Sequence, residues 1–149
     1  MQRIIRAALI LAVAATVLAG AAKAQQAPAA PQSPQQKARI TLVRKGRVIF
    51  RAPVGIGAPG TPTPAGNFYI RDELTSFPPG TIYGALAFGT SGKSATLTDW
   101  PKGGVIGLHG TNQPQLIPGR ISHGCIRLRN HDITRLAKLL PIGTPLTIR

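Results

Sequence analysis

The chain has 149 residues, one cysteine, and 18 Lys or Arg against 4 Asp or Glu, which gives a net charge of +14 at pH 7. This length suits one domain with a core of its own, and a single cysteine excludes both an internal disulfide and Cys-x-x-Cys redox chemistry. The basic balance favours polyanions or acidic substrates as partners and says little about the fold.

The first 24 residues have the pattern of a secretory signal peptide. Two arginines precede an apolar run from Ala7 to Ala22, and the sequence AKA, which ends at Ala24, supplies a small-x-small cleavage site. The run is shorter than the roughly 20 residues that span a bilayer, which favours cleavage over a membrane anchor. We therefore expect secretion to the periplasm or cell wall, membrane contact only through the cleaved signal, and no nucleic-acid partner.

Residues 25–38 are rich in Gln, Pro and Ala and contain few side chains large enough to form a core. This composition predicts a disordered linker between the cleavage site and the domain. Residues 39–149 form the predicted folded domain.

The domain begins with alternating apolar and polar residues that have Lys45-Gly46 at their centre, a pattern that predicts two strands joined by a tight turn. The Pro-rich stretch GAPGTPTPAG predicts a loop, followed by a short strand at 68–71 and a further strand near 83–88. GGVIGLHG predicts a buried strand that ends at His109, and the final GTPLTIR predicts a last strand.

One helix is expected after residue 129. Asn130 is a suitable N-cap, Asp132 places negative charge in the first turn, and Pro141 would end the helix. The apolar positions of one helical face are Ile133, Leu136, Ala137 and Leu140. The elements together predict a mainly β single domain with one helix packed on it.

The single cysteine lies in SHGCIRLRN, residues 122–130. In an extended segment alternate side chains share a face, so His123, Cys125 and Arg127 would project together, opposite the apolar side chains. An inert core cysteine would share the apolar face instead. An ordinary thiol has a pKa of about 8.5, so a reactive Cys125 needs a base or a cation beside it.

Three histidines could supply that base. His109 ends a separate strand and could approach Cys125 from an adjacent position in a sheet. His123 lies two residues before Cys125 on the same segment, about 6.6 Å away along a strand, where a bridging hydrogen bond is not assured. His131 lies in the first helical turn, away from the apolar face. The geometry ranks His109 first, His123 second and His131 last.

The stretch IGLHGTNQPQLIPGRISHGCIRL resembles the active-site signature of the L,D-transpeptidase family (the YkuD domain), in which a histidine and a variable spacer precede Ser/Thr-His-Gly-Cys. The upstream TPTPAGNF and the C-terminal RLRNHDITRLAKLLPIGTPLTI resemble the same family, so the similarity covers about Ile40 to Ile148. It implies a YkuD-like catalytic domain over residues 39–149, with mixed sheets packed around an active-site groove.

The resemblance implies a role for each matching residue. Cys125 would be the nucleophile and His109 the general base, with the carbonyl of Gly110 orienting the imidazole. His123 and Gly124 would shape the site, and main-chain N–H groups near Gly124 and Cys125 would stabilise an oxyanion. The substrate-binding candidates are Arg127, Ser122, Thr111 and Asn112.

Such enzymes build or remodel bacterial peptidoglycan, which contributes to cell wall biogenesis and cell shape. The implied reaction proceeds through a cysteine thioester with a donor tetrapeptide stem, which an amine of a second stem takes up to give a 3→3 cross-link. With water as acceptor the enzyme would be an L,D-carboxypeptidase. The implied partners are peptidoglycan stem peptides, no cofactor is needed, and a monomer is expected.

Other classes of function remain open from the residues alone. The histidines and Cys125 could form a zinc site, although their spacing is not a usual ligand pattern and the sequence lacks His-Glu-x-x-His. A non-catalytic basic module that binds the cell wall fits the charge and the export equally well. It leaves Cys125 and the neighbouring histidines without a role, so the enzyme is the preferred hypothesis.

Overall fold

Strands dominate the structure, and the prediction of a mainly β fold with one helix is confirmed. The computed structural model describes residues 38–94 and 104–149. The predicted signal peptide and the predicted linker, apart from Ala38, lie outside the described residues. The described residues all belong to one compact unit.

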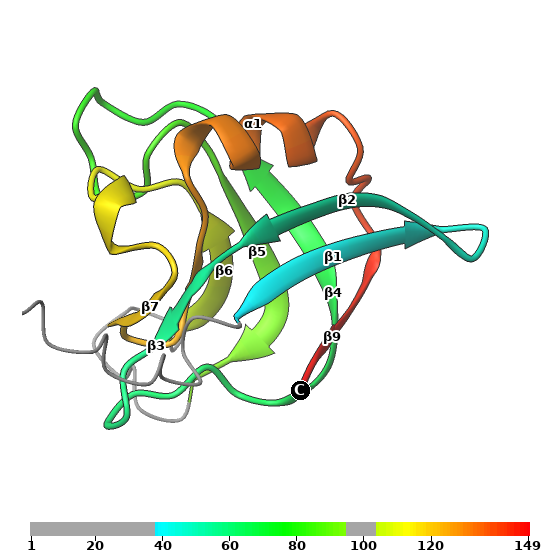
Figure 1. The fold of residues 1–149 in the computed structure, drawn as a ribbon, viewed down its shortest axis with the longest axis horizontal. Helices are drawn as coiled ribbons and strands as arrows, with labels where there is room; N and C mark the ends of the chain where they lie inside the picture. The colour runs from blue at the N-terminus through cyan, green and yellow to red at the C-terminus, as the bar shows by residue number, and fades with distance from the viewer. Residues whose placement is uncertain (1–37, 95–103) are drawn as a thin grey trace, which may run out of the picture. The chain divides into compact units, whose positions relative to one another are not determined.

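The strands form a two-stranded hairpin and a seven-stranded mixed sheet (Figure 1). In chain order the elements are β1 (Arg39–Arg44), β2 (Arg47–Pro53), β3 (Gly55–Gly57), β4 (Gly66–Leu74), β5 (Ala87–Lys93), β6 (Val105–His109), the 3-10 helix η2 (Pro114–Leu116), β7 (Gly119–Ser122), β8 (Ile126–Arg127), α1 (Asn130–Ala137) and β9 (Pro145–Ile148). The large sheet has the order β7-β3-β8-β6-β5-β4-β9. Its β3–β7 and β6–β8 pairs are parallel, and the other pairs are antiparallel.

The β1–β2 hairpin confirms the predicted pair of strands. Arg44 pairs with Arg47, which leaves Lys45 and Gly46 as a two-residue turn. Both turn residues have positive φ, 49° for Lys45 and 74° for Gly46. This is the turn geometry that matches the twist of two antiparallel strands.

The segment between the hairpin and β6 differs most from the prediction. β4 is longer than the expected strand at 68–71, because it pairs with β5 along one edge and with β9 along the other. β5 begins at Ala87, and Tyr83 lies in a turn instead of the predicted strand. The Gly84 N–H donates to the Thr81 carbonyl at 3.0 Å, which closes this turn.

Helix α1 is shorter than predicted and begins differently. Its N-cap is Arg129, and no side chain caps it. Asn130, the expected N-cap, is the first helical residue. The helix ends at Ala137, so Pro141 does not terminate it. The predicted apolar face is confirmed, because Ile133 and Leu136 are fully buried.

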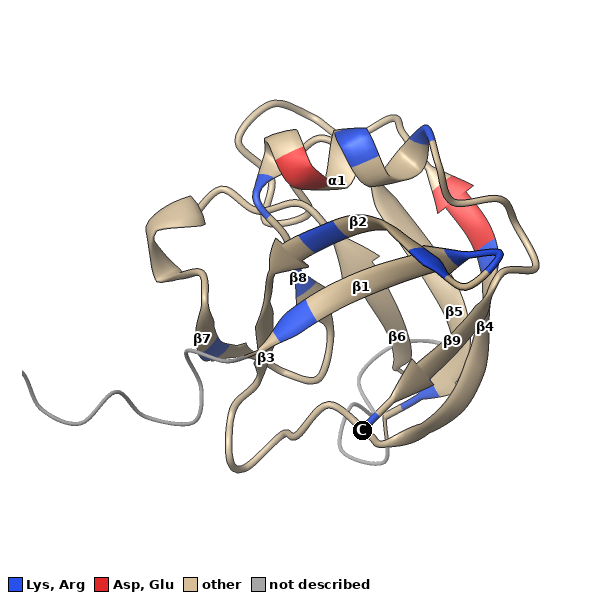
Figure 2. Cartoon of the chain, turned by 45° about the vertical axis from the view of Figure 1, so that its right-hand side comes forward, with Lys and Arg blue, Asp and Glu red and all other residues tan. Residues whose placement is uncertain are grey.

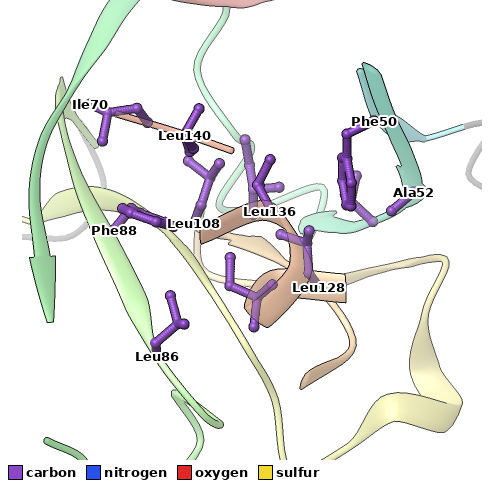
Figure 3. Close-up of a cluster of buried hydrophobic side chains, with 12 residues drawn as sticks. Phe50, Ala52, Ile70, Leu86, Phe88, Leu108, Leu128, Leu136 and Leu140 are labelled. Carbon is purple, nitrogen blue, oxygen red and sulfur yellow. The ribbon is translucent and has the colours of Figure 1, made fainter. Parts of the chain in front are cut away.

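The core lies between the large sheet, α1 and the hairpin (Figure 3). It contains Phe50, Ala52, Val54, Ile70, Leu86, Phe88, Leu108, Ile126, Leu128, Ile133, Leu136 and Leu140. The Arg135 guanidinium covers the ring of Phe50, 5.6 Å from its centroid, and so closes the packing at the surface. Leu108 of β6 and Ile126 of β8 both point into this core, which turns the residues on either side of them toward the opposite face of the sheet.

Basic residues are spread along the hairpin, including its tip, and on α1, whereas acidic residues occur on β4 and α1 (Figure 2). No helix in the described ranges is long and apolar enough to span a membrane.

Candidate active site

The register of the parallel strands β6 and β8 assembles the candidate site. Leu108 lies opposite Ile126, and His109 lies opposite Arg127. Because Leu108 and Ile126 face the core, His109 and Arg127 share the other face, and Cys125 precedes Arg127 by two residues on that same face. Ideal strand spacing from this register would place the Cα atoms of Cys125 and His109 about 8 Å apart, a separation that side chains can bridge.

A sharp bend before β8 presents Cys125, so residues 122–130 are not the continuous extended segment that was predicted. Gly124 has φ 121°, a left-handed conformation that favours glycine. A Cβ there would also lie 3.1 Å from Ile106 Cδ1. The Ser122 hydroxyl accepts the Gly124 N–H at 3.2 Å and donates to the Cys125 carbonyl at 2.5 Å. Ser122 is 2% exposed, so its hydroxyl closes this bend and is not presented to a substrate.

The Pro-rich loop braces the bend from outside. The Ser122 carbonyl accepts the Ala58 N–H at 2.8 Å and the Thr61 hydroxyl at 3.1 Å. Thr63 Oγ1 accepts the Gly57 N–H at 2.9 Å, which holds the loop against β3. The TPTP stretch therefore supports the position of the cysteine.

The sulfur of Cys125 is half-buried beside β6. It accepts the Gly107 N–H at 3.4 Å and lies 3.9 Å from the Val105 carbonyl. Burial raises the pKa of the Cys125 thiol, while the Gly107 N–H and the positive charge of Arg127 oppose this rise by favouring the thiolate. The net rise means that the resting thiol is protonated at neutral pH.

The imidazole of His109 is 3% exposed, and its Nδ1 lies 2.6 Å from the Gly110 carbonyl. A carbonyl only accepts, so Nδ1 carries the proton and Nε2 is the basic nitrogen. Burial lowers the pKa of His109 to about 4, and Arg127 adds to this lowering, although the Gly110 and Ile82 carbonyls favour the protonated ring. His109 is therefore neutral at pH 7, the form that can accept a proton.

No hydrogen bond joins the Cys125 and His109 side chains in the described part of the chain. Both groups rest in their neutral forms, which distinguishes the pair from a preformed thiolate–imidazolium pair. Catalytic hydrogen bonds commonly tighten only when substrate binds.

Tyr83 is a site residue that the sequence analysis missed. Its ring meets the His109 ring edge-on, with centroids 5.2 Å apart, and stacks on Phe77 at the same centroid distance. Burial raises the pKa of Tyr83, and the nearby Cys125 raises it further, against the opposite effect of Arg127. The only signal in the sequence is an aromatic pair within the Gly- and Pro-rich FPPGTIYG.

Arg127 has a side-chain nitrogen without a hydrogen-bond partner in the described residues. Its Nε is buried and has no hydrogen-bond partner among residues 38–94 and 104–149. A buried donor without a partner is costly, and it lies beside His109 on the face that carries Cys125.

The remaining predicted residues lie around the centre. His123 is exposed on the bend, and the His131 side chain is 76% exposed on α1. Thr111 is 1% exposed and accepts the Gln113 N–H through its hydroxyl at 3.0 Å, so it holds a loop. Asn112 donates to the Gly80 carbonyl at 3.0 Å. Within the described ranges, no group of three or more His, Cys, Asp or Glu side chains could hold a metal ion.

A cavity of about 260 Å³ lies beside the site. Its walls come from residues 77–81, Gly84, Ala85, Thr111, Asn112 and Asn130. The predicted substrate-binding residues Thr111 and Asn112 thus border a cavity, on the segment that directly follows His109.

Comparison with known proteins gives the family of the chain. The model of the YkuD family, described as an L,D-transpeptidase catalytic domain, matches residues 33–148. The putative L,D-transpeptidase YkuD of Bacillus subtilis is 36% identical over 109 residues, which are 73% of this chain and 58% of that protein. The chain thus covers less than two thirds of this relative's length.

Solved structures agree with this assignment. A crystal structure of Enterococcus faecium L,D-transpeptidase has a TM-score of 0.56 and 25% identity, over 74% of this chain and 45% of that one. The NMR structure of the catalytic domain of the E. faecium enzyme has a TM-score of 0.54 and 24% identity, over 77% of this chain and 92% of that domain, and shows a likeness of fold alone. The predicted family is confirmed: the chain belongs to the YkuD family of L,D-transpeptidase catalytic domains.

Proposed function

We propose that the protein is a peptidoglycan L,D-transpeptidase that forms 3→3 cross-links, with Cys125 as nucleophile and His109 as general base. The observation that carries the proposal is the β6–β8 register, which gathers a thiol, a neutral imidazole and an unpaired guanidinium nitrogen on one face of the sheet. Family membership supports the substrate class that we propose, a tetrapeptide stem of peptidoglycan.

The first half of the reaction forms the acyl-enzyme. His109 Nε2 takes the thiol proton as Cys125 Sγ forms a bond to the carbonyl carbon of the third stem residue, which places negative charge on the carbonyl oxygen. Ser122 Oγ already accepts the Gly124 N–H, which leaves the Cys125 N–H as the main-chain oxyanion donor that we propose. The C–N bond to D-alanine then breaks, and the imidazolium returns its proton to the departing amine.

The second half releases the acyl group. An amine of a second stem attacks the thioester carbon, His109 accepts a proton from that amine, and the C–S bond breaks. The proton then returns to the sulfur, so the enzyme ends in its starting form. The reaction is a net exchange of one amide for another and consumes no cofactor.

Arg127 is the group that we propose for the carboxylate of the leaving D-alanine. Its buried Nε donor lacks a partner in the described residues and would gain a charge-assisted hydrogen bond. Asn112 remains a candidate substrate contact beside the cavity, whereas Ser122 and Thr111 are better assigned to holding the loops that frame the site.

The sequence pattern of residues 1–24 supports export, which we propose together with the activity. The signal peptide of residues 1–24 would be removed and residues 25–38 would act as a linker. The domain at 39–149 would work as a monomer in the periplasm or cell wall, contributing to wall biogenesis and cell shape.

The decisive experiment incubates the protein lacking residues 1–24 with disaccharide-tetrapeptide and analyses protein and products by mass spectrometry. We expect an acyl adduct on Cys125, with loss of D-alanine, and cross-linked dimers as products. The variants Cys125→Ser and His109→Gln should give no adduct.

Each other outcome points to a defined alternative. Tripeptide without dimer would identify an L,D-carboxypeptidase. An adduct on another residue would refute the site. Binding to isolated sacculi that Cys125→Ser leaves intact, with no adduct in the wild type, would identify a non-catalytic wall-binding module.

A further inference from the structure

The side chain of Asn130 does not cap its own helix but reaches two other segments. Its Oδ1 accepts the Thr111 N–H at 3.0 Å and the Ala85 N–H at 3.3 Å. Thr111 follows the His109–Gly110 pair, and Ala85 belongs to the turn that carries Tyr83. One amide oxygen thus joins the start of α1 to both loops around the imidazole.

The contact with Thr111 acts on His109 through a single peptide group. The Thr111 N–H and the Gly110 carbonyl belong to the same planar trans peptide, so they point in opposite directions. Asn130 holds the N–H end of this peptide, and the carbonyl end accepts the proton of His109 Nδ1 at 2.6 Å. The three groups form one hydrogen-bonded chain, whose members polarise one another.

The packing leaves the Asn130 oxygen little freedom. A Cβ added to Gly84 or to Gly110 would collide with Asn130 Oδ1. Glycine at both positions therefore admits the amide oxygen into the space between the two loops. The Gly110 N–H donates to the Leu86 carbonyl at 3.1 Å, which fixes the other side of Gly110.

We infer that Asn130 is a positioning residue for the acyl transfer: by holding the Gly110–Thr111 peptide, it keeps the His109 proton on Nδ1, so that Nε2 stays unprotonated and can accept the proton of Cys125. If that peptide rotated, the Thr111 N–H would turn toward Nδ1 and favour the opposite tautomer, which has no base at Nε2. The inference rests on the proposed function for its kinetic consequence, but its effect on the tautomer requires no reaction.

The first measurement is the ¹⁵N NMR spectrum of the His109 ring, recorded on the full-length chain in the absence of substrate. The wild type should show a protonated Nδ1 and an unprotonated Nε2 at neutral pH. Asn130→Ala should give a mixture of tautomers, whereas Asn130→Asp, which keeps an acceptor at the same place, should retain the Nδ1–H form. Asn67→Ala is the matched control, since the Asn67 Oδ1 is also a hydrogen-bond acceptor, here of the Thr147 hydroxyl at 2.9 Å, but on the distant β4–β9 edge.

The second measurement is the rate of acyl transfer. Asn130→Ala should lower kcat by about 10- to 100-fold, the range expected when a catalytic group is misplaced, with KM little changed. Asn130→Asp should recover most of the loss. If Asn130→Ala does not fold, Asn130→Ser replaces it, because serine keeps a small polar side chain at this position but is shorter than asparagine and places its hydroxyl farther from the Thr111 N–H.

An unchanged His109 tautomer in the folded Ala or Ser variant would overturn the inference, as would a kcat loss no greater than that of Asn67→Ala. If the wild type has no transferase activity, the proposed function fails while the NMR comparison still decides the role of Asn130.

Discussion

At the scale of single residues, Arg127 acts on both groups that exchange a proton, although burial has the larger effect on each. It lies opposite His109 and two residues after Cys125. Its positive charge favours the thiolate of Cys125 and disfavours the imidazolium of His109, so it lowers the pKa of both groups. The same guanidinium therefore assists loss of the thiol proton and, after transfer, makes the imidazolium a stronger acid toward the leaving amine.

The effect of the Arg127 charge on the pKa of Cys125 predicts how Arg127→Gln changes the reactivity of the thiol. Without the positive charge the pKa of Cys125 rises further, so alkylation by iodoacetamide at pH 8 should be severalfold slower than in the wild type. The pH profile of the alkylation rate, followed by mass spectrometry, should move to higher pH. Arg120→Gln, which removes an exposed charge from β7, is the control; equal rates for Arg127→Gln and wild type would contradict this role of Arg127.

At the scale of elements, the β1–β2 turn contains a local conflict. Lys45 has φ 49°, in a region that asparagine and glycine occupy more readily than lysine. The strands on both sides override this preference because β2 buries Phe50 and Ala52 in the core.

Lys45→Asn should therefore raise the free energy of unfolding by about 0.5 kcal/mol, and Gly46→Ala should lower it by about 1 kcal/mol. Urea denaturation of both variants measures these changes. Lys45→Ala serves as the control, since it removes the same side chain and keeps the unfavourable φ. Equal stability of Lys45→Asn and Lys45→Ala would show that the turn conformation does not matter.

At the scale of the whole molecule, the burial of neutral His109 links stability to pH. The pKa of His109 is about 4 in the folded chain, against about 6.5 in an unfolded chain. Between these values the unfolded chain binds one more proton than the folded chain, so stability increases as pH rises through this window. Burial of His109 therefore affects the stability of the fold as well as the chemistry of the site.

The free energy of unfolding should increase by about 3 kcal/mol between pH 4 and pH 6.5 through His109. Urea titrations at several pH values measure this change, and His109→Gln should lose it. The exposed His131 provides the matched control, His131→Gln, which should keep the dependence. A His109→Gln profile identical to that of the wild type would refute the contribution of His109.

The sequence by itself determined the elements whose signal is local. Alternating apolar and polar residues on both sides of Lys45-Gly46 were sufficient to predict the β1–β2 hairpin. A run of apolar residues identified β6, and apolar residues at helical spacing identified the buried face of α1. The family also followed from the sequence, because Ser-His-Gly-Cys and the upstream His-Gly lie on a continuous stretch of chain.

Only the tertiary structure decided how the candidate site is held. The side chain of Tyr83 lies against His109. The Ser122 hydroxyl makes its hydrogen bonds to Gly124 and Cys125 within the bend. The Asn130 side chain accepts the Thr111 N–H and does not cap its own helix. The Tyr83 and Asn130 contacts join groups that are far apart in the sequence, and the Ser122 contact depends on the bend that the chain makes at Gly124. Composition and periodicity report which face of an element is buried, whereas a hydrogen bond or a ring contact across two loops depends on where the packed core brings them.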